Sequence, residues 1–377
     1  MVLPSGLNAW LVTDYALARE LSVDPRLTMD IRRLTRLPDG LGHDRCPLGR
    51  PALHRRHWLN TDGTEHRALR KLIAPVFTEH SLASQQAMTE TVVEQALNDI
   101  ATRDRVDLIT HYARRVAVAV MDHLLGVPAA LRERHPEAAP EVALLGEPLG
   151  EQRRAARGER TQIMQELIDL RRADPGDDIV SHLLRSRAHR DDLTLFTIHG
   201  MLCLLFTAGV ENTTTLIAHG AALLLRSPDA RRALLSSEET ARGVVEELLR
   251  HHPLTTGTWH FSTASIPAGT ATIPADSCVL FCLPSANRDP DVFPDPDRLD
   301  PRRTNAGAHL SFGHGRHYCP GAPLARLEGR IALRSLLHRF PSLRLATPPE
   351  HLTWQGIHLN RRYATLPVLP GPERKSP

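Results

Sequence analysis

One short segment constrains this chain more than any other: a glycine-rich loop that presents a single cysteine, Cys319, ahead of an apolar helical run. Backbone N–H groups and the positive end of a helix stabilise a thiolate, and Pro323 suits the first turn of that helix. The glycines carry no Cβ, so the loop can approach something bulky and flat. One thiolate presented in this way fits an axial ligand of haem iron, where it favours O–O cleavage.

The same segment resembles the haem-thiolate loop of the cytochrome P450 family. The resemblance implies one haem b, held by Cys319 as the metal ligand, with Ala325 at the start of the following helix. The matching loop positions are Phe312, Gly313, Gly315, His317, Cys319 and Gly321. Two other interpretations are a helix-capping loop around a structural cysteine, and a zinc site of His314, His317 and Cys319. No second Cys/His pair stands at ligand spacing to complete the zinc site.

Composition points to a soluble globular chain of 377 residues, with 24% charged and 41% hydrophobic residues. The formal net charge of +3 does not indicate a nucleic-acid partner. Five scattered cysteines suit a reducing cytosol better than a disulfide framework. Neither a secretory signal nor an apolar run of about 18–20 residues is visible, so we expect a cytoplasmic monomer without a membrane partner.

Hydrophobic periodicity predicts a mainly α chain with a smaller β region. Strand patterns begin near residue 254, and residues 352–369 read as a hairpin, whereas 128–160 read as a mobile surface region. Neither repeats nor a linker divide the chain, so residues 1–377 are expected to form one domain, which the resemblance makes a triangular helical prism. The long helical patterns cover residues 65–77, 81–102, 107–125, 193–226, 238–251 and 326–340.

Two charged clusters are assigned by the resemblance. Glu247 and Arg250 share one helical face at i, i+3, where a surface ion pair is the ordinary interpretation. The resemblance instead makes them, with Arg298, a buried structural network beneath the haem.

His66 and Arg70 also share a helical face, and a solvated face is again the ordinary interpretation. The resemblance assigns them to one haem propionate and His317 to the other propionate region. His260 stands where the family usually has arginine, so its charge would depend on pH.

Residues 208–213 of the long helical pattern resemble the oxygen-side helix of the family. The small pair Ala208 and Gly209 would admit dioxygen and substrate, and Glu211 fits the acid that organises water for proton delivery. Asn212 occupies the usual threonine position, and Thr213 comes one residue, about 100° of rotation, too late. An asparagine amide donates and accepts, so it can hold a water. The alternative is an enzyme that couples or desaturates its substrate without inserting oxygen.

A mostly apolar substrate pocket follows from the resemblance and fits many mid-sized natural products. The candidate residues are Trp58, Leu204, Leu205, Val210, Leu254, Thr255, Trp259, Gln355 and Ile357. Arg326, Arg330 and Arg334 recur at i, i+4 and form either a solvated face or a docking site for an acidic ferredoxin.

We therefore expect a haem-thiolate oxidoreductase of bacterial secondary metabolism that uses dioxygen. Electrons would come from NAD(P)H through a reductase and a ferredoxin. Monooxygenation of a hydrophobic natural product is the leading hypothesis, oxidative coupling or desaturation of a cyclic dipeptide or aromatic metabolite is the second, and a non-catalytic haem-binding protein is the third.

Overall fold

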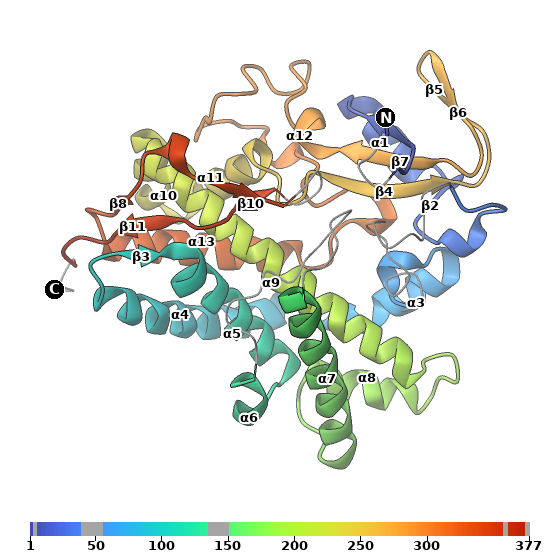
Figure 1. Ribbon diagram of the computed structural model, residues 1–377, viewed down its shortest axis with the longest axis horizontal. Helices are drawn as coiled ribbons and strands as arrows, with labels where there is room; N and C mark the ends of the chain where they lie inside the picture. Colours follow the sequence, from blue (N-terminus) through green and yellow to red (C-terminus); the bar gives the residue numbers. More distant parts are fainter. Residues whose placement is uncertain (3–5, 39–55, 135–150, 357–360, 374–377) are drawn as a thin grey trace.

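The computed structural model describes residues 1–2, 6–38, 56–134, 151–356 and 361–373. Within these ranges helices predominate and the strands form small sheets (Figure 1), as the periodicity predicted. The predicted single domain stays a prediction. The α-helices are α1 (Tyr15–Val23), α3 (Gly63–Ile73), α4 (Glu79–Ala101), α5 (Arg114–Leu125), α6 (Ala129–Arg132), α7 (Glu151–Ala173), α8 (Ile179–Arg187), α9 (Leu195–Arg226), α10 (Pro228–Ser236), α11 (Glu238–His251), α12 (Leu283–Ala286) and α13 (Ala322–Arg339).

Helix α9 is the central element and crosses the middle of the molecule in Figure 1. Its N-cap, Thr194, accepts a hydrogen bond from the backbone N–H of Thr197, and it ends at Arg226, with Ser227 as the C-cap ahead of Pro228. It packs against α5 and α13. By length and composition it is apolar enough to cross a membrane, but 72% of its most apolar window is buried in the protein, as in a core helix.

The strands form four small sheets, of which the largest has the order β1-β7-β4-β2. In that sheet β1 pairs with β7 in parallel, and the other two pairings are antiparallel. The other sheets have the orders β3-β11-β8, β10-β9 and β5-β6. The strands are β1 (Ala9–Val12), β2 (Leu27–Thr28), β3 (Val106–Asp107), β4 (Gly257–Ser262), β5 (Ile266–Ala268), β6 (Ala271–Ile273), β7 (Cys278–Cys282), β8 (Arg344–Leu345), β9 (Trp354–Gln355), β10 (Arg362–Tyr363) and β11 (Pro367–Leu369).

The main difference from the predicted elements is α7, whose first ten residues fall in the segment 128–160 that we expected to be mobile. The helix is stabilised from its other half, where Ile163, Met164, Leu167 and Ile168 are fully buried. These residues repeat at helical spacing and join the core cluster that also holds residues of α8 and α9. Tertiary packing therefore decides the structure of a stretch whose own composition is polar.

Candidate active site

Cys319 lies just before α13, which begins at Ala322, and ends a loop in which two glycines adopt backbone angles that other residues rarely adopt. Gly313 and Gly315 have positive φ angles of 75° and 72°. A Cβ on Gly315 would also lie 2.9 Å from Cγ1 of Val23. Burial raises the pKa of the Cys319 thiol, and backbone hydrogen bonds from Gly321 and Ala322 and the charge of Arg70 oppose this. The donors and the cation that would stabilise a thiolate are therefore in place.

Three imidazoles from different elements meet beside this loop. The ring of His317 lies 4.4 Å from that of His66 on α3 and 6.4 Å from that of His260 on β4, measured between centroids. His66 Nε2, His260 Nδ1 and His317 Nδ1 are buried and have no hydrogen-bond partner among the described residues. A buried polar atom left unpaired costs about 1–3 kcal/mol, so a cluster of three fits an anionic group that would pair with them.

Asp62, which the sequence analysis did not single out, anchors this cluster. Its carboxylate accepts hydrogen bonds from His317 Nε2 and Arg316 Nε, each at 3.0 Å, and from the backbone N–H of Met29. Burial opposes ionisation, but the hydrogen bonds from His317 and Thr28 hold the pKa of Asp62 well below its usual range. An aspartate directly before the α3 helix was the only sequence signal for it.

Burial keeps two of the imidazoles neutral at pH 7. It lowers the pKa of His66 to about 4, with help from His317 and Arg70, and that of His260 to about 3, with help from His317. Arg70, whose pKa burial also lowers, keeps its charge near Cys319. The cluster thus combines fixed charges with imidazoles that an anion would induce to take up protons.

Helix α9 is largely buried, but a short stretch near its middle is partly exposed. From Thr197 to Ala222 every residue is buried except five, of which Ala208 alone is exposed and the other four are half-buried. Leu204, Ala208 and Asn212 follow one another at four-residue spacing, so they share a face. The five residues are Leu204, Thr207, Ala208, Gly209 and Asn212.

The other predicted oxygen-side residues point elsewhere or are paired. Thr213 is only 3% exposed and, as its helical position predicted, lies off the open face. A Cβ on Gly209 would lie 2.4 Å from Sδ of Met121, so this glycine permits close packing against α5. Glu211 is buried and forms ion pairs with Arg362 of β10 and, at 3.4 Å, with Arg114 of α5. The sequence analysis missed both arginines.

A comparison with protein-family models decides the family. The model described as Cytochrome P450 matches residues 95–366, more than half of the chain. The chain is a cytochrome P450. Membership implies a haem-thiolate centre with a cysteine ligand and dioxygen as co-substrate, and the Cys319 loop with its histidine cluster fits that group.

Curated and solved relatives agree on the family. The P450 is 36% identical to the mycinamicin IV hydroxylase/epoxidase of Micromonospora griseorubida, over 97% of this chain and 90% of that protein. It is similar to the tirandamycin C-bound P450 monooxygenase TamI, with a TM-score of 0.86 and 35% identity. That match covers 97% of this chain and 90% of TamI. It is also similar to CxnD, a P450 for C–S bond formation in chuangxinmycin biosynthesis, with a TM-score of 0.85 and 29% identity. That match covers 98% of this chain and 89% of CxnD. The predicted fold and enzyme class, a P450 monooxygenase, are confirmed.

The predicted ion-pair network of the P450 has a different third member. Glu247 and Arg250 pair in the core at 2.7 Å, with side-chain exposures of 1% and 0%. The second guanidinium on Glu247 belongs to Arg303, at 3.1 Å. Among the described residues Arg298 contributes only its backbone carbonyl, which accepts hydrogen bonds from Arg250 and Arg303, so its predicted charge role was wrong. The irregular chain over residues 287–303 turns back on itself, and its sequence does not reveal which arginine points inward.

Several predicted pocket residues are core residues instead. Leu205 and Val210 are buried in the cluster that holds Met121 and Trp58. Side chains alternate along β4, so Thr258 and His260 line a small cavity with His317, whereas Trp259 packs against Leu7 and Ala9 on the other side.

The remaining pocket candidates divide into four groups. Leu254 is buried in the cluster that contains Phe312. Thr255 and Gln355 are half-buried, and Gln355 pairs with Arg362 across the β9–β10 ribbon. Ile357 lies outside the described residues. Leu204 alone among the predicted apolar walls lies on the open face of α9.

The arginine stripe on α13 is not an open cationic surface. Arg326 forms a bidentate pair with Glu246, at 2.6 and 2.9 Å, and its guanidinium lies 4.5 Å from the centre of the Phe312 ring. Arg330 and Arg334 both contact Glu238 of α11. All three guanidiniums are therefore paired with internal carboxylates, and the predicted role of the stripe in docking a ferredoxin is not retained.

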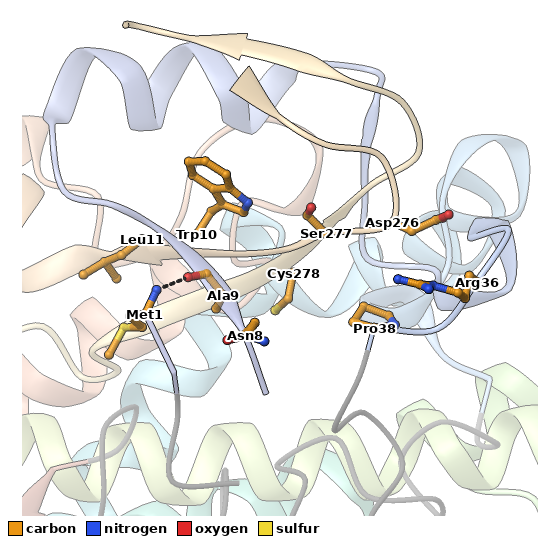
Figure 2. A pocket seen from close by; sticks show the side chains of 10 residues that line it. All are labelled: Met1, Asn8, Ala9, Trp10, Leu11, Arg36, Pro38, Asp276, Ser277 and Cys278. Atoms are coloured by element: carbon orange, nitrogen blue, oxygen red, sulfur yellow. Dashed lines mark hydrogen bonds between the residues drawn. The ribbon is translucent and has the colours of Figure 1, made fainter. Parts of the chain in front are cut away.

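A cavity of about 390 Å³ lies apart from these residues, beside β1 and the start of β7 (Figure 2). Trp10, Leu11, Arg36 and Asp276 are among its lining residues. None of the proposed haem or oxygen-side residues lines it, so it is not part of the candidate active site.

Proposed function

We propose that this P450 inserts oxygen into a mid-sized hydrophobic natural product of bacterial secondary metabolism. The observation that carries the proposal is the half-buried thiol of Cys319 just before a helix, in a loop beside three imidazoles with unpaired nitrogens. A relative that is 36% identical is a hydroxylase/epoxidase, which favours hydroxylation or epoxidation. Because the relatives are enzymes, a non-catalytic haem protein is the weaker alternative.

In this proposal Cys319 binds the iron of haem b, and the thiolate-ligated haem supplies dioxygen activation and O–O cleavage. His66, Arg70, His260 and His317 bind the propionates. The residues that pack against the thiolate face of the haem are Phe312, Gly313, Gly321 and Ala325.

On the oxygen side, the open face of α9 supplies the contact surface. Ala208 leaves room for dioxygen and substrate, and Leu204 lines the substrate side. The Asn212 amide holds a water, because it can both donate and accept hydrogen bonds. The carboxylate of Glu211 organises that water for proton delivery, while Thr213 has no direct part.

Product mass tests the reaction type. With isotope-labelled dioxygen, a surrogate ferredoxin and a substrate found by spin-shift screening, the expected product has gained one labelled oxygen atom. A product that has lost two hydrogens without gaining oxygen would contradict the proposal.

Oxidative coupling or desaturation is the second candidate, because Asn212 replaces the usual hydroxyl and the similar P450 CxnD serves C–S bond formation. Asn212→Thr separates the two candidates. If the wild-type reaction is coupling, the threonine variant is expected to shift its products toward oxygen insertion.

For electron supply we propose an acidic ferredoxin, reduced by NAD(P)H through a reductase. Arg67 and Lys71 are exposed at i, i+4 on α3, and neither forms an ion pair within the described part of the chain. The same helix carries Arg70, whose charge acts on Cys319. Helix α3 therefore carries free cations next to Arg70 in the sequence, and we propose that electrons enter near them. We further infer a cytoplasmic, monomeric, single-domain protein.

A further inference from the structure

One buried ion-pair cluster joins the oxygen-side helix to the C-terminal part of the chain. Nη1 of Arg362 contacts Oε2 of Glu211, and Nη1 of Arg114 lies 3.4 Å from Oε1. The Glu211 side chain is 5% exposed and each arginine side chain 13% exposed. Charges removed from water in this way interact more strongly than surface pairs, and removing one partner is far more costly.

The ribbon of β9 and β10 that carries Arg362 has a second attachment to α9. The backbone N–H of Tyr363 donates to Nε2 of His219 at 3.3 Å, and the Trp354 ring lies 5.5 Å from the His219 ring. His219 follows Glu211 by eight residues, about 12 Å along the helix axis. The ribbon therefore lies along α9 over the stretch that contains Glu211, as Figure 1 shows for β10.

We propose that Arg362 is a positioning residue for Glu211. Each carboxylate oxygen of Glu211 faces a different arginine from a different element, so the plane of the carboxylate is held from two sides. Arg362 is not among the proposed haem-binding or iron-binding residues and acts through Glu211. The inference rests on the proposed function, in which Glu211 organises water for proton delivery.

Arg362 is expected to matter because it fixes the orientation of the Glu211 carboxylate. A glutamate side chain has three rotatable bonds, and an ion pair with a buried guanidinium selects one arrangement. Misplacing a catalytic group by about 1 Å can lower a rate about 100-fold. Loss of Arg362 should therefore impair proton delivery while the haem site, formed by other elements, stays intact.

Two variants test the role of Arg362, with a neighbour as the control. Arg362→Gln removes the charge, and Arg362→Lys keeps it. Arg361→Gln is the matched control, because Arg361 is exposed and stacks 4.4 Å from the Trp354 ring centre. Arg114→Gln probes the other carboxylate oxygen and covers the case in which Arg362→Gln fails to fold. Glu211→Gln serves as the reference for complete loss of the carboxylate.

The measurement needs no substrate. Holoprotein reduced by dithionite is mixed with dioxygen, and its reoxidation is followed in the Soret band in ordinary and deuterated water. Thermal unfolding and the Soret spectrum report folding and haem content. We expect Arg362→Gln to reoxidise about tenfold more slowly, with a larger solvent isotope effect, whereas Arg362→Lys stays within about threefold of wild type and Arg361→Gln matches it.

The outcomes separate the inference from the proposed function. If Glu211→Gln slows reoxidation but Arg362→Gln and Arg114→Gln do not, the positioning role is wrong and the role of Glu211 stands. If Glu211→Gln itself reoxidises at the wild-type rate, the proposed role of Glu211 fails and the inference fails with it. Equal effects of Arg362→Gln and Arg361→Gln would reduce Arg362 to a structural element of the ribbon.

Discussion

The Nε2 atom of His317 lies 3.0 Å from Oδ1 of Asp62, and this contact joins the cysteine loop to the start of α3. Arg316, the residue before His317, contacts the same oxygen at 3.0 Å. Asp62 therefore orients the imidazole through its Nε2 atom, which leaves Nδ1 available for a haem propionate.

Asp62→Asn is expected to weaken haem retention, because the imidazole of His317 loses its charged partner. A hydrogen bond to a charged group contributes about 1.5–3 kcal/mol, so haem loss should accelerate about tenfold or more. Transfer of haem to apomyoglobin measures the rate. Asp24→Asn is the control, since Asp24 forms a surface pair with Arg26. Equal rates for wild type and Asp62→Asn would show that this contact does not support haem binding.

His260 should make haem retention depend on pH. Burial, with the charges of His317 and Arg316, lowers its pKa to about 3. A propionate would raise this pKa, so haem binding takes up a proton. By linkage, haem affinity is highest at low pH and falls as pH rises through the pKa of the haem-bound state. Haem transfer measured from pH 6 to 9 is expected to slow as pH falls. His260→Arg, with a fixed charge, should reduce this slope to the part that His66 contributes, and an unchanged slope would contradict the account.

Arg303, not Arg298, should carry the stability of the network beneath the proposed haem site. Arg303→Met leaves Glu247 with one buried partner fewer, and breaking such pairs costs about 3–5 kcal/mol. Arg298 is exposed and contributes a backbone carbonyl, so Arg298→Met should change stability by less than about 0.5 kcal/mol. Urea unfolding of the two holoprotein variants compares these values. A larger loss in Arg298→Met would reverse the assignment.

Arg303 and Arg298 show which contacts could be predicted from the sequence and which could not. The Glu247–Arg250 contact is local, set by helical spacing, and was predictable. Arg303 and Arg298 stand in the same irregular stretch, and only the folded path of the backbone selects one. The side of the sheet on which Trp259 lies depends on the alternation of side chains along β4. A one-residue error in the predicted register places it on the wrong side. Arg362 and Glu211 are 151 residues apart, and their pairing had no local signal.

Charge reversal on α3 should slow electron transfer. Arg67→Glu with Lys71→Glu is expected to lower the rate of ferredoxin-driven reduction at low salt, with the difference shrinking as salt screens the surface. Arg172→Glu with Arg187→Glu reverses two exposed charges on α7 and α8 and is the control. Stopped-flow reduction under carbon monoxide follows the rate. Equal slowing in both double variants would indicate a general charge effect in place of a docking site.

The central claim is that Cys319 is the thiolate ligand of a haem, and the carbon monoxide difference spectrum of the reduced protein tests it most directly. Wild type is expected to show the red-shifted Soret band of a thiolate-ligated haem. Cys319→Ser should lose that band, whereas Cys282→Ser, a substitution of a half-buried free cysteine on β7, should keep it. A Cys319→Ser protein that retained the thiolate band would contradict the assignment.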